Sequence, residues 1–140
     1  MAETTADAER LLEEYETIWN ERDYSKIPDV VSESYVRVSP VAGEGVRGHD
    51  GLEEFIRGLE ASFSDFEVSF EEQLVGEDVA MFEATFTGTH DGEFNEIPPT
   101  NEEVEFPNMS IIQFEDGKIR EHRTYYDPQE FAEQIGVTAD

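Results

Sequence analysis

Asp127, close to the C-terminus, is the leading candidate for acid–base chemistry, and His122 and His90 are the next candidates. Proton transfer beside a carbonyl needs a base whose pKa is raised from about 3.9 towards neutrality, and a dry aromatic pocket would raise the pKa of Asp127. An imidazole titrates near pH 6.5, so His122 or His90 could relay the proton. Strict strand alternation places His122 and Asp127 on opposite faces, however, and groups Arg123, Tyr125 and Asp127 together.

Asp127 also has the features of a helix N-cap. Pro128 follows it, and Glu130 occupies the third helical position. A capping carboxylate accepts backbone N–H bonds, which lower its pKa and make it a poorer acid. His90 has a similar alternative, because it begins a long loop in which an imidazole can simply bond to the backbone. The sequence leaves both roles possible at both positions.

Aromatic and polar side chains on several predicted elements are candidates to bind a small, apolar, carbonyl-bearing ligand. A tyrosine hydroxyl could hold a carbonyl oxygen, and an inward-facing Arg123 would favour an anionic or carbonyl-bearing compound. For Tyr15 and Trp19, core packing is the alternative. The predicted ligand-binding residues are Tyr15, Trp19, Tyr35, Phe82, Met109, Arg123 and Tyr125.

The sequence predicts neither a metal site nor a cofactor. Three scattered histidines and no cysteine provide no metal-ligand spacing. A nucleophile elbow, a P-loop and a dinucleotide fingerprint are also missing from the sequence.

Hydrophobic periodicity predicts two helices, a series of strands and a C-terminal helix after Asp127. One apolar helical face comprises Leu11, Leu12, Tyr15, Ile18 and Trp19, and a second comprises Leu52, Phe55, Ile56, Leu59 and Phe63. Alternation predicts strands over 34–39, 66–70, 79–87, 104–114 and 118–126, with a glycine-rich loop at 41–48 and a hairpin turn at Asp116–Gly117. We therefore expect an α+β fold in which helices pack on one face of a curved antiparallel sheet.

Length and charge restrict the classes of partner. The 140 residues fit a single domain spanning 1–140. With 35 acidic against 9 basic residues the net charge is −26, which disfavours binding to nucleic acid or to an anionic membrane. The acidic residues are spread along the whole chain, as in proteins adapted to molar salt, so we expect a haloarchaeal source. The N-terminus has no signal-peptide pattern, which predicts a cytoplasmic protein.

Three segments together resemble the SnoaL-like polyketide cyclases, within the nuclear transport factor 2-like superfamily that includes ketosteroid isomerase. They are residues 18–23 (IWNERD), residues 86–100 (FTGTHDGEFNEIPPT), and residues 116–122 (DGKIREH) with Asp127. The resemblance implies a cone-shaped sheet wrapped around N-terminal helices, and a homodimer formed through the outer sheet face. The founding cyclases close a ring by an intramolecular aldol reaction without metal or cofactor. Asp127 matches their acid/base by position, and a histidine on a neighbouring strand assists.

The chain also departs from the family pattern. Glu96 stands where relatives often have glycine, Arg123 where they often have tryptophan, and residues 35–40 replace a segment that often contains histidine. Three functions therefore stay possible: a cofactor-free cyclase, isomerase or dehydratase; a non-catalytic small-molecule-binding protein; and a structural module with a vestigial pocket. Whether the chain is an enzyme is not determined by its sequence.

Overall fold

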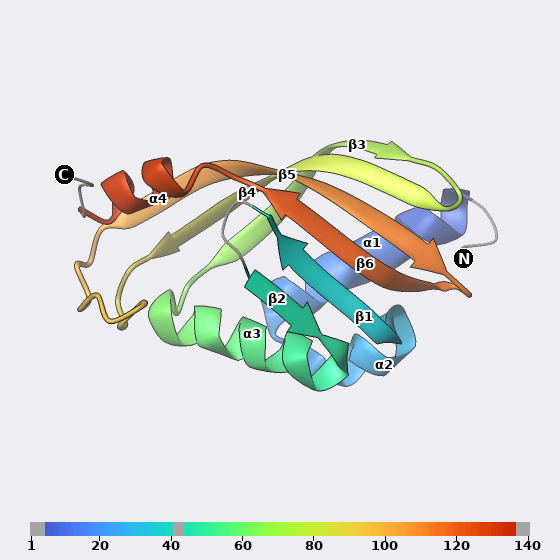
Figure 1. Ribbon diagram of the computed structural model, residues 1–140, viewed down its shortest axis with the longest axis horizontal. Helices are drawn as coiled ribbons and strands as arrows, with labels where there is room; N and C mark the ends of the chain where they lie inside the picture. The colour runs from blue at the N-terminus through green and yellow to red at the C-terminus, as the bar shows by residue number, and fades with distance from the viewer. Residues whose placement is uncertain (1–4, 41–43, 137–140) are drawn as a thin grey trace.

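Helices and a strongly curved six-stranded sheet make up the computed structural model, which describes residues 5–40 and 44–136 (Figure 1). In chain order the elements are α1 (Thr5–Glu21), a 3₁₀ turn (Tyr24–Lys26), α2 (Ile27–Val30), β1 (Val31–Ser39), β2 (Glu44–Arg47), α3 (Gly48–Ser62), β3 (Glu67–Val75), β4 (Val79–Thr89), β5 (Glu103–Glu115), β6 (Lys118–Tyr125) and α4 (Pro128–Gln134). The strand order is β2–β1–β6–β5–β4–β3. The predicted α+β class is confirmed.

Two expectations about the sheet need correction. The pairing is not antiparallel throughout, because β1 runs parallel to β6, with Arg37 opposite His122. The segment expected to be a loop over 41–48 contains β2, which pairs with β1, and the first residue of α3; residues 41–43 of that segment lie outside the described residues. The parallel pair joins the first strand to the last and brings their inward-facing side chains together.

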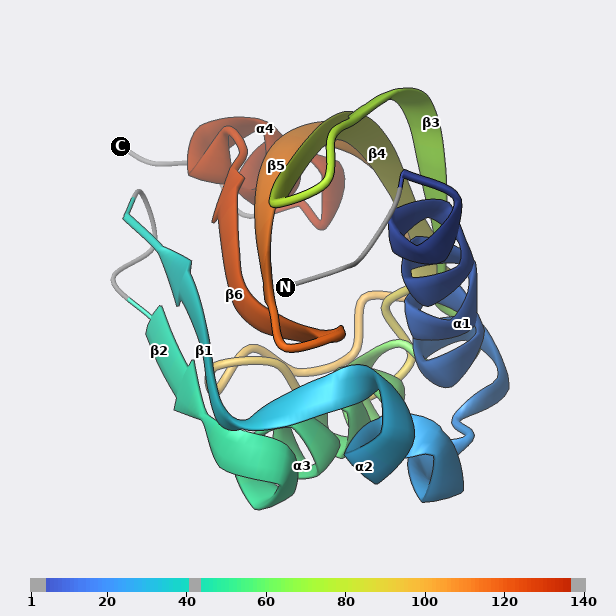
Figure 2. The ribbon, with the colours of Figure 1, turned by 90° about the vertical axis from the view of Figure 1, so that its right-hand side faces the viewer.

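Side-chain alternation decides which residues fill the concave side of the sheet. On β4 the side chains of Ala80, Phe82, Ala84 and Phe86 are buried, as the sequence pattern predicts. The sheet curls from β2 round to β3, and α1 and α3 lie along its open side (Figure 2). The buried apolar faces of both helices complete the core, which removes their apolar surface from water.

The predicted hairpin at Asp116–Gly117 is confirmed. Both residues have left-handed backbone angles, with φ of 52° and 75°, and they connect Glu115 to its cross-strand partner Lys118. Two successive positive φ values match the right-handed twist of the flanking strands, and Asp-Gly adopts them at little cost.

The long loop between β4 and β5 contains a second tight turn, at Asn95–Glu96. Phe94 and Ile97 exchange two backbone hydrogen bonds around it, and φ is 47° at Asn95 and 69° at Glu96. Asparagine tolerates this region, whereas a glutamate there costs roughly 1 kcal/mol. Glu96 is the position at which the resemblance leads one to expect glycine, and the turn geometry explains that preference.

We expect Glu96→Gly to raise the free energy of unfolding by about 0.5–1 kcal/mol, because relief of the left-handed glutamate outweighs the added entropy of the unfolded chain. Chemical denaturation in molar KCl measures the change. The matched control is Glu93→Gly, which removes the same charge from an exposed position of the same loop whose φ is not positive. It should destabilise the protein, and equal effects of the two substitutions would contradict the strain argument.

Candidate functional site

Two adjoining cavities occupy the space between the curved sheet and α3. The larger, which we call the apolar chamber, has a volume of about 110 Å³ and a mainly aromatic lining. It is lined by Arg37, Phe55, Leu59, Phe63, Phe86, Phe94, Phe106, Asn108, Thr124, Tyr126 and Phe131. The smaller, the polar chamber, has a volume of about 50 Å³ and is lined by Trp19, Arg37, Leu59, Val68, Phe70, Ala84, Phe86, Asn108, Ser110, His122 and Thr124. The shared residues Arg37, Leu59, Phe86, Asn108 and Thr124 make them two ends of one interior site.

A chain of buried hydrogen bonds runs behind the polar chamber, from α1 and β1 to β6 and β5. The hydroxyl oxygens of Tyr35 and Tyr15 lie 2.5 Å apart, and the Tyr15 hydroxyl lies 2.8 Å from Nδ1 of His122. On the other side of the ring, Nε2 of His122 lies 3.0 Å from the Ser110 hydroxyl, which donates to Oδ1 of Asn108 at 3.0 Å. Five polar side chains from four elements thus satisfy one another in the core.

The last hydrogen bond of this network, from Ser110 to Asn108, determines which group donates in each of the others. Because the Ser110 hydroxyl donates to Asn108, its oxygen accepts from Nε2–H of His122. Nδ1 of His122 then accepts from Tyr15, and Tyr15 accepts from Tyr35. The Thr124 hydroxyl also donates to Oδ1 of Asn108, at 3.2 Å. His122 is therefore the neutral tautomer that carries its hydrogen on Nε2.

Burial shifts the pKa values of all three aromatic members of this network. Burial raises the pKa of Tyr15 to about 12 and raises the pKa of Tyr35 well above its usual value. Burial, reinforced by the positive charge of Arg37, lowers the pKa of His122 well below its usual value. The tyrosines therefore remain protonated and His122 neutral at pH 7, so the network is an uncharged relay.

His122 should make stability depend on pH. Its pKa in the folded protein is depressed, so the unfolded chain binds more protons as the pH falls below about 6.5, and stability is lost by up to about 1.4 kcal/mol per pH unit. Above that pH the histidine contributes no slope. Denaturation in molar KCl between neutral and mildly acidic pH should show a shallower slope for His122→Gln than for wild type. Parallel slopes would contradict the buried neutral imidazole.

Arg37 places a guanidinium group at the junction of the two chambers. Its Cζ atom lies 4.5 Å from the centroid of the Phe55 ring and 5.4 Å from that of Trp19, so both rings stack against the cation. Arg37 lines both chambers, together with Asn108 and Thr124. None of these three residues was predicted from the sequence, although alternation with the buried Tyr35 on β1, and with Phe106 and Ser110 on β5, indicates that Arg37 and Asn108 face inward.

Asp127 does not line either chamber. Its exposed side chain caps α4, where Oδ1 accepts hydrogen bonds from the backbone N–H groups of Gln129, at 3.0 Å, and Glu130, at 3.3 Å. Of the two roles that the sequence allowed, capping is the one seen in the geometry.

His90 is buried in the long loop and anchors it. Nδ1 lies 2.9 Å from the Thr100 hydroxyl and accepts the Thr100 backbone N–H at 3.3 Å, and its backbone bonds to Glu102 and Asn101. It lies outside both chamber linings. Of the three predicted catalytic residues, the structure places only His122 at the site.

The predicted ligand-binding residues separate into an inner and an outer group. Tyr15, Trp19, Tyr35 and Phe82 are buried around His122, and Trp19 lines the polar chamber. Phe82 is packed against Phe70, with ring centroids 4.3 Å apart. Arg123, Tyr125 and Met109 point to the outer face, where Arg123 pairs with Glu121 at 2.8 Å. An inward Arg123 was therefore a wrong expectation, and Arg37 is the cation that faces the interior.

The motif in residues 86–100 serves to dock the loop against the end of α3. The backbone N–H groups of Asp91 and Gly92 donate to the Ser62 carbonyl at 3.1 and 3.0 Å, and the Asp91 carboxylate accepts from the backbone N–H and hydroxyl of Ser64. A Cβ atom on Gly92 would collide with the Ala61 carbonyl, so only glycine allows this approach. The docked loop positions Phe94 in the apolar chamber.

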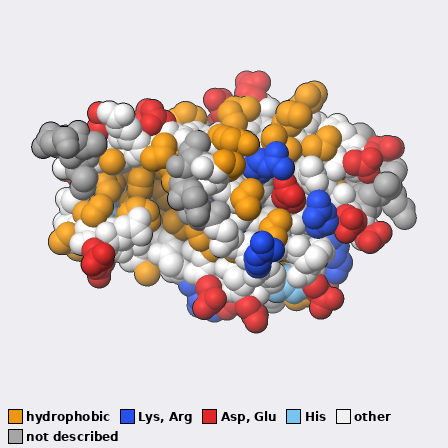
Figure 3. Space-filling model, in the orientation of Figure 1, with side chains coloured by type: hydrophobic (Ala, Val, Ile, Leu, Met, Phe, Trp, Pro, Cys, Tyr) orange, Lys and Arg blue, Asp and Glu red, His pale blue; other side chains and the backbone are white. Residues whose placement is uncertain are grey.

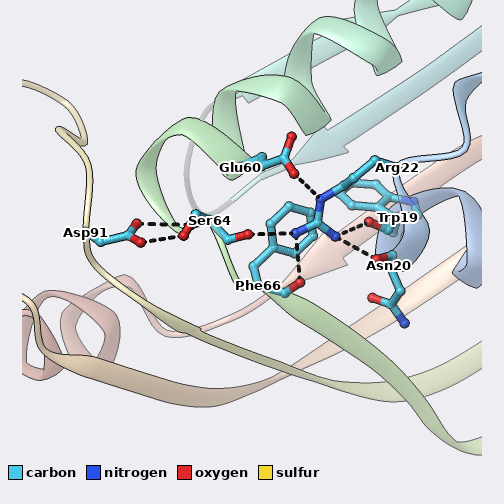
Figure 4. A network of polar contacts seen from close by, with 7 residues as sticks. All are labelled: Trp19, Asn20, Arg22, Glu60, Ser64, Phe66 and Asp91. Carbon is cyan, nitrogen blue, oxygen red and sulfur yellow. Dashed lines mark hydrogen bonds and ion pairs between the residues drawn. The ribbon is translucent and has the colours of Figure 1, made fainter.

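Arg22, from the motif in residues 18–23, joins α1 to the turn before β3 (Figure 4). Its guanidinium donates to the carbonyls of Trp19 at 2.7 Å, Asn20 at 2.9 Å and Phe66 at 3.0 Å, pairs with Glu60 at 3.1 Å, and stacks 3.8 Å from the Phe66 ring centroid. Two of these carbonyls belong to the last turn of α1, which has no intrahelical donors for them. The motif therefore stabilises the end of α1, which carries Trp19, against the turn before β3.

Within the described residues, no three His, Asp or Glu side chains are arranged to hold a metal ion. The helices in the same part of the chain include none with the length and apolar character needed to cross a bilayer. The site is thus built from uncharged polar groups, aromatic rings and one guanidinium.

Solved structures with the same fold are numerous. A protein from Jannaschia sp. CCS1 assigned as a SnoaL-like polyketide cyclase has a TM-score of 0.83 at 22% identity, covering 97% of this chain and 95% of that one. TsrD from Streptomyces laurentii has a TM-score of 0.82 at 25% identity, covering 94% and 96%. A protein with a ketosteroid isomerase-like fold from Catenulispora acidiphila DSM 44928 has a TM-score of 0.77 at 13% identity, covering 91% and 92%.

Sequence comparison identifies the family. No curated protein matches the chain. The model of the SnoaL-like polyketide cyclases matches residues 9–135, which includes both motifs described above and every residue that lines the two chambers. The chain therefore belongs to the SnoaL-like polyketide cyclase family.

Proposed function

We propose that this protein binds a small, largely apolar molecule carrying a hydrogen-bond acceptor such as a carbonyl oxygen. The observation that carries the proposal is the pair of adjoining chambers, one lined mainly by aromatic rings and the other bringing Arg37, Asn108 and Trp19 together. Ligand pockets typically combine an apolar lining with a few convergent polar groups. Binding, with or without chemistry, is the function this arrangement supports best.

The volume of the apolar chamber restricts the ligand to about one ring. A dry cavity of about 150 Å³ accommodates benzene, and this chamber, at about 110 Å³, is smaller, so a single-ring ligand would also use the adjoining polar chamber of about 50 Å³. Phe94 and Phe131 both line it, with ring centroids 5.2 Å apart. A multi-ring compound would require these rings to move, so single-ring ketones are the better probes.

A thermal-shift titration in molar KCl with acetophenone, and with a three-ring ketone for comparison, tests the proposal. Acetophenone should stabilise the protein by about 2.7 kcal/mol at roughly 100 times its dissociation constant. Leu59→Phe, which adds bulk where the chambers meet, should abolish the shift, whereas Leu74→Phe on the exposed outer face should preserve it. If single-ring ketones cause no shift in the melting temperature, the proposal is wrong.

A cofactor-free acid–base reaction on such a carbonyl compound is the second candidate function. His122 is the one imidazole in the lining of either chamber, and a tyrosine relay holds its tautomer. Exchange of the α-hydrogens of acetophenone for deuterium, followed by NMR, measures enolisation directly. Catalysed exchange that disappears in His122→Gln would support an enzyme; binding without exchange would leave a non-catalytic binding protein.

We also propose that the protein works in a cytoplasm with molar salt. At a net charge of −26, self-repulsion weakens the fold in dilute buffer, and at molar salt the Debye length falls to about 3 Å. The unfolding midpoint should therefore rise steeply as KCl is added. Full stability in dilute buffer would contradict this origin.

A homodimer through the outer sheet face is the remaining proposal. Leu74, Met81, Met109 and Tyr125 are exposed there, and the registers place Leu74 beside Met81 and Met109 beside Tyr125. Figure 3 shows hydrophobic side chains, in orange, along the upper edge of the molecule. Exposed apolar groups on one face are typical of an association surface. Sedimentation in molar KCl should show a dimer that Met81→Glu with Met109→Glu converts to a monomer; an unchanged mass for the double variant would exclude this face.

A further inference from the structure

We infer that the indole N–H of Trp19 donates the hydrogen bond that holds the ligand's acceptor oxygen. The oxygen then reaches into the polar chamber, and the ligand's ring lies mainly in the apolar chamber. The inference rests on the proposed function and deepens it, because it names the residue that selects an oxygen acceptor and the direction in which the ligand lies.

The indole Nε1–H of Trp19 is a buried donor without an acceptor. Trp19 is 3% exposed and lines the polar chamber, and its Nε1 makes no hydrogen bond within the described residues. It lies close enough to Tyr15 to lower the pKa of that hydroxyl, but the Tyr15 oxygen is already engaged by Tyr35 at 2.5 Å and by His122 at 2.8 Å. A buried N–H without a partner costs free energy, which an acceptor on a ligand recovers.

The ring that carries this N–H is held in one orientation. Its plane lies nearly perpendicular to the rings of Tyr15, Phe55 and His122, with centroids 6.0, 5.9 and 6.5 Å away. The Trp19 carbonyl accepts from Arg22, which fixes the backbone at the end of α1. Because the donor is already in position, binding a ligand costs little conformational entropy at this residue.

Neighbouring donors of the polar chamber are used within the hydrogen-bond network. The hydroxyls of Ser110 and Thr124 donate to Asn108, and Nε2–H of His122 is directed at Ser110. A ligand oxygen that took one of these hydrogens would break an existing bond, whereas the Trp19 N–H is available without such an exchange. An indole nitrogen donates and does not accept, so the bond selects a compound with an acceptor atom.

The linings of the two chambers set the direction of the ligand. Trp19, Ser110 and His122 line only the polar chamber, whose volume of about 50 Å³ is too small for a ring that needs a cavity of about 150 Å³. The residues that line only the apolar chamber are all aromatic: Phe55, Phe63, Phe94, Phe106, Tyr126 and Phe131. A ring therefore packs best among these side chains, with its oxygen-bearing substituent pointing towards Trp19.

The resonance of the indole N–H tests this contact directly. Trp19 is the only tryptophan of the chain, so this group has a signal of its own in a proton–nitrogen correlation spectrum recorded in molar KCl. The probes are acetophenone and α-methylstyrene, an isostere in which a CH₂ group replaces the carbonyl oxygen. The ring shifts the signal similarly in both cases, whereas only acetophenone should add the downfield displacement of a hydrogen-bonded proton.

Isothermal titration of the same two compounds gives an independent measurement. The ratio of the dissociation constant of α-methylstyrene to that of acetophenone should fall roughly tenfold in Trp19→Phe, which keeps an aromatic ring but removes the donor. Phe70→Leu is the matched control, because it removes a ring from the lining of the same chamber and no donor. It should weaken both compounds alike and leave the ratio unchanged.

The outcomes separate the inference from the function on which it rests. A downfield displacement specific to acetophenone, with a ratio that falls only in Trp19→Phe, supports the inference, and the spectrum of the wild type decides it even if Trp19→Phe does not fold. Equal displacement by two compounds that both bind overturns the role of Trp19 and leaves a small-molecule site. If neither compound binds, both the inference and the proposed function fail.

Discussion

Replacing Arg22 with methionine is expected to lower the free energy of unfolding by roughly 3 kcal/mol, because hydrogen bonds to a charged group contribute about 1.5–3 kcal/mol and this guanidinium makes several. Its side chain is only 15% exposed, so the carbonyls of Trp19, Asn20 and Phe66 would lose donors that water replaces incompletely. Methionine retains packing against the Phe66 ring. Denaturation in molar KCl measures the loss.

Two further variants identify the cause of that loss. Arg10→Met removes the same charge from an exposed position of α1 where the arginine only pairs with Asp7 and Glu14, and should cost less than about 0.5 kcal/mol. Arg22→Lys retains the charge but lacks the planar guanidinium with its several N–H donors. It should therefore recover less than half of the free energy of unfolding that Arg22→Met loses. Full recovery by lysine would show that charge alone, and not multiple directed bonds, connects α1 to the turn before β3.

Replacing Gly92 with alanine is expected to destabilise the protein by roughly 3 kcal/mol or more, since backbone must move and two hydrogen bonds must weaken. The new Cβ would overlap the Ala61 carbonyl oxygen and lie 2.9 Å from its carbon and 3.2 Å from the Ser62 Cα. These are backbone atoms of α3, which cannot turn away as a side chain can. The bonds from Asp91 and Gly92 to the Ser62 carbonyl would open.

Gly58→Ala is the matched control for this substitution. Gly58 lies on the exposed side of α3, and an added Cβ meets nothing within 4 Å. Alanine in a helix is favoured over glycine by about 1 kcal/mol, so this variant should be slightly more stable than wild type. Gly92→Ala should also weaken acetophenone binding, because the displaced loop carries Phe94 away from the apolar chamber. A Gly92→Ala protein as stable as wild type would refute the docking role.

Two of the three segments that resemble the family, residues 18–23 and 86–100, therefore act mainly by holding the elements around the site in place. Arg22 and Gly92 make no contact with either chamber, but they hold the elements that carry Trp19 and Phe94. Trp19, Phe86 and Phe94 belong to these motifs and line the chambers, but most of the lining, including Arg37 and Asn108, lies outside them. A shared motif can thus preserve a fold while the ligand varies from one member to another.

The sequence by itself determined the local structure and the direction of most side chains. Helical periodicity predicted the buried faces of α1 and α3, and alternation predicted that Phe82 is buried and that Arg123 and Tyr125 share a face opposite His122. The Asp116–Gly117 turn was likewise predicted correctly. These features depend on backbone sterics and on neighbours a few residues away, which a single sequence specifies.

Only the tertiary structure decided which face of β6 points inward and which residues meet there. The parallel pairing of β1 with β6 places Arg37 beside His122, and α1 adds Tyr15, although these residues are far apart in sequence. It also places Asp127 at the exposed start of α4 rather than in a chamber. Strand pairing between distant segments depends on how the curved sheet packs over α1 and α3. The free energy of that packing comes from contacts between residues far apart in the sequence, which no short sequence pattern specifies.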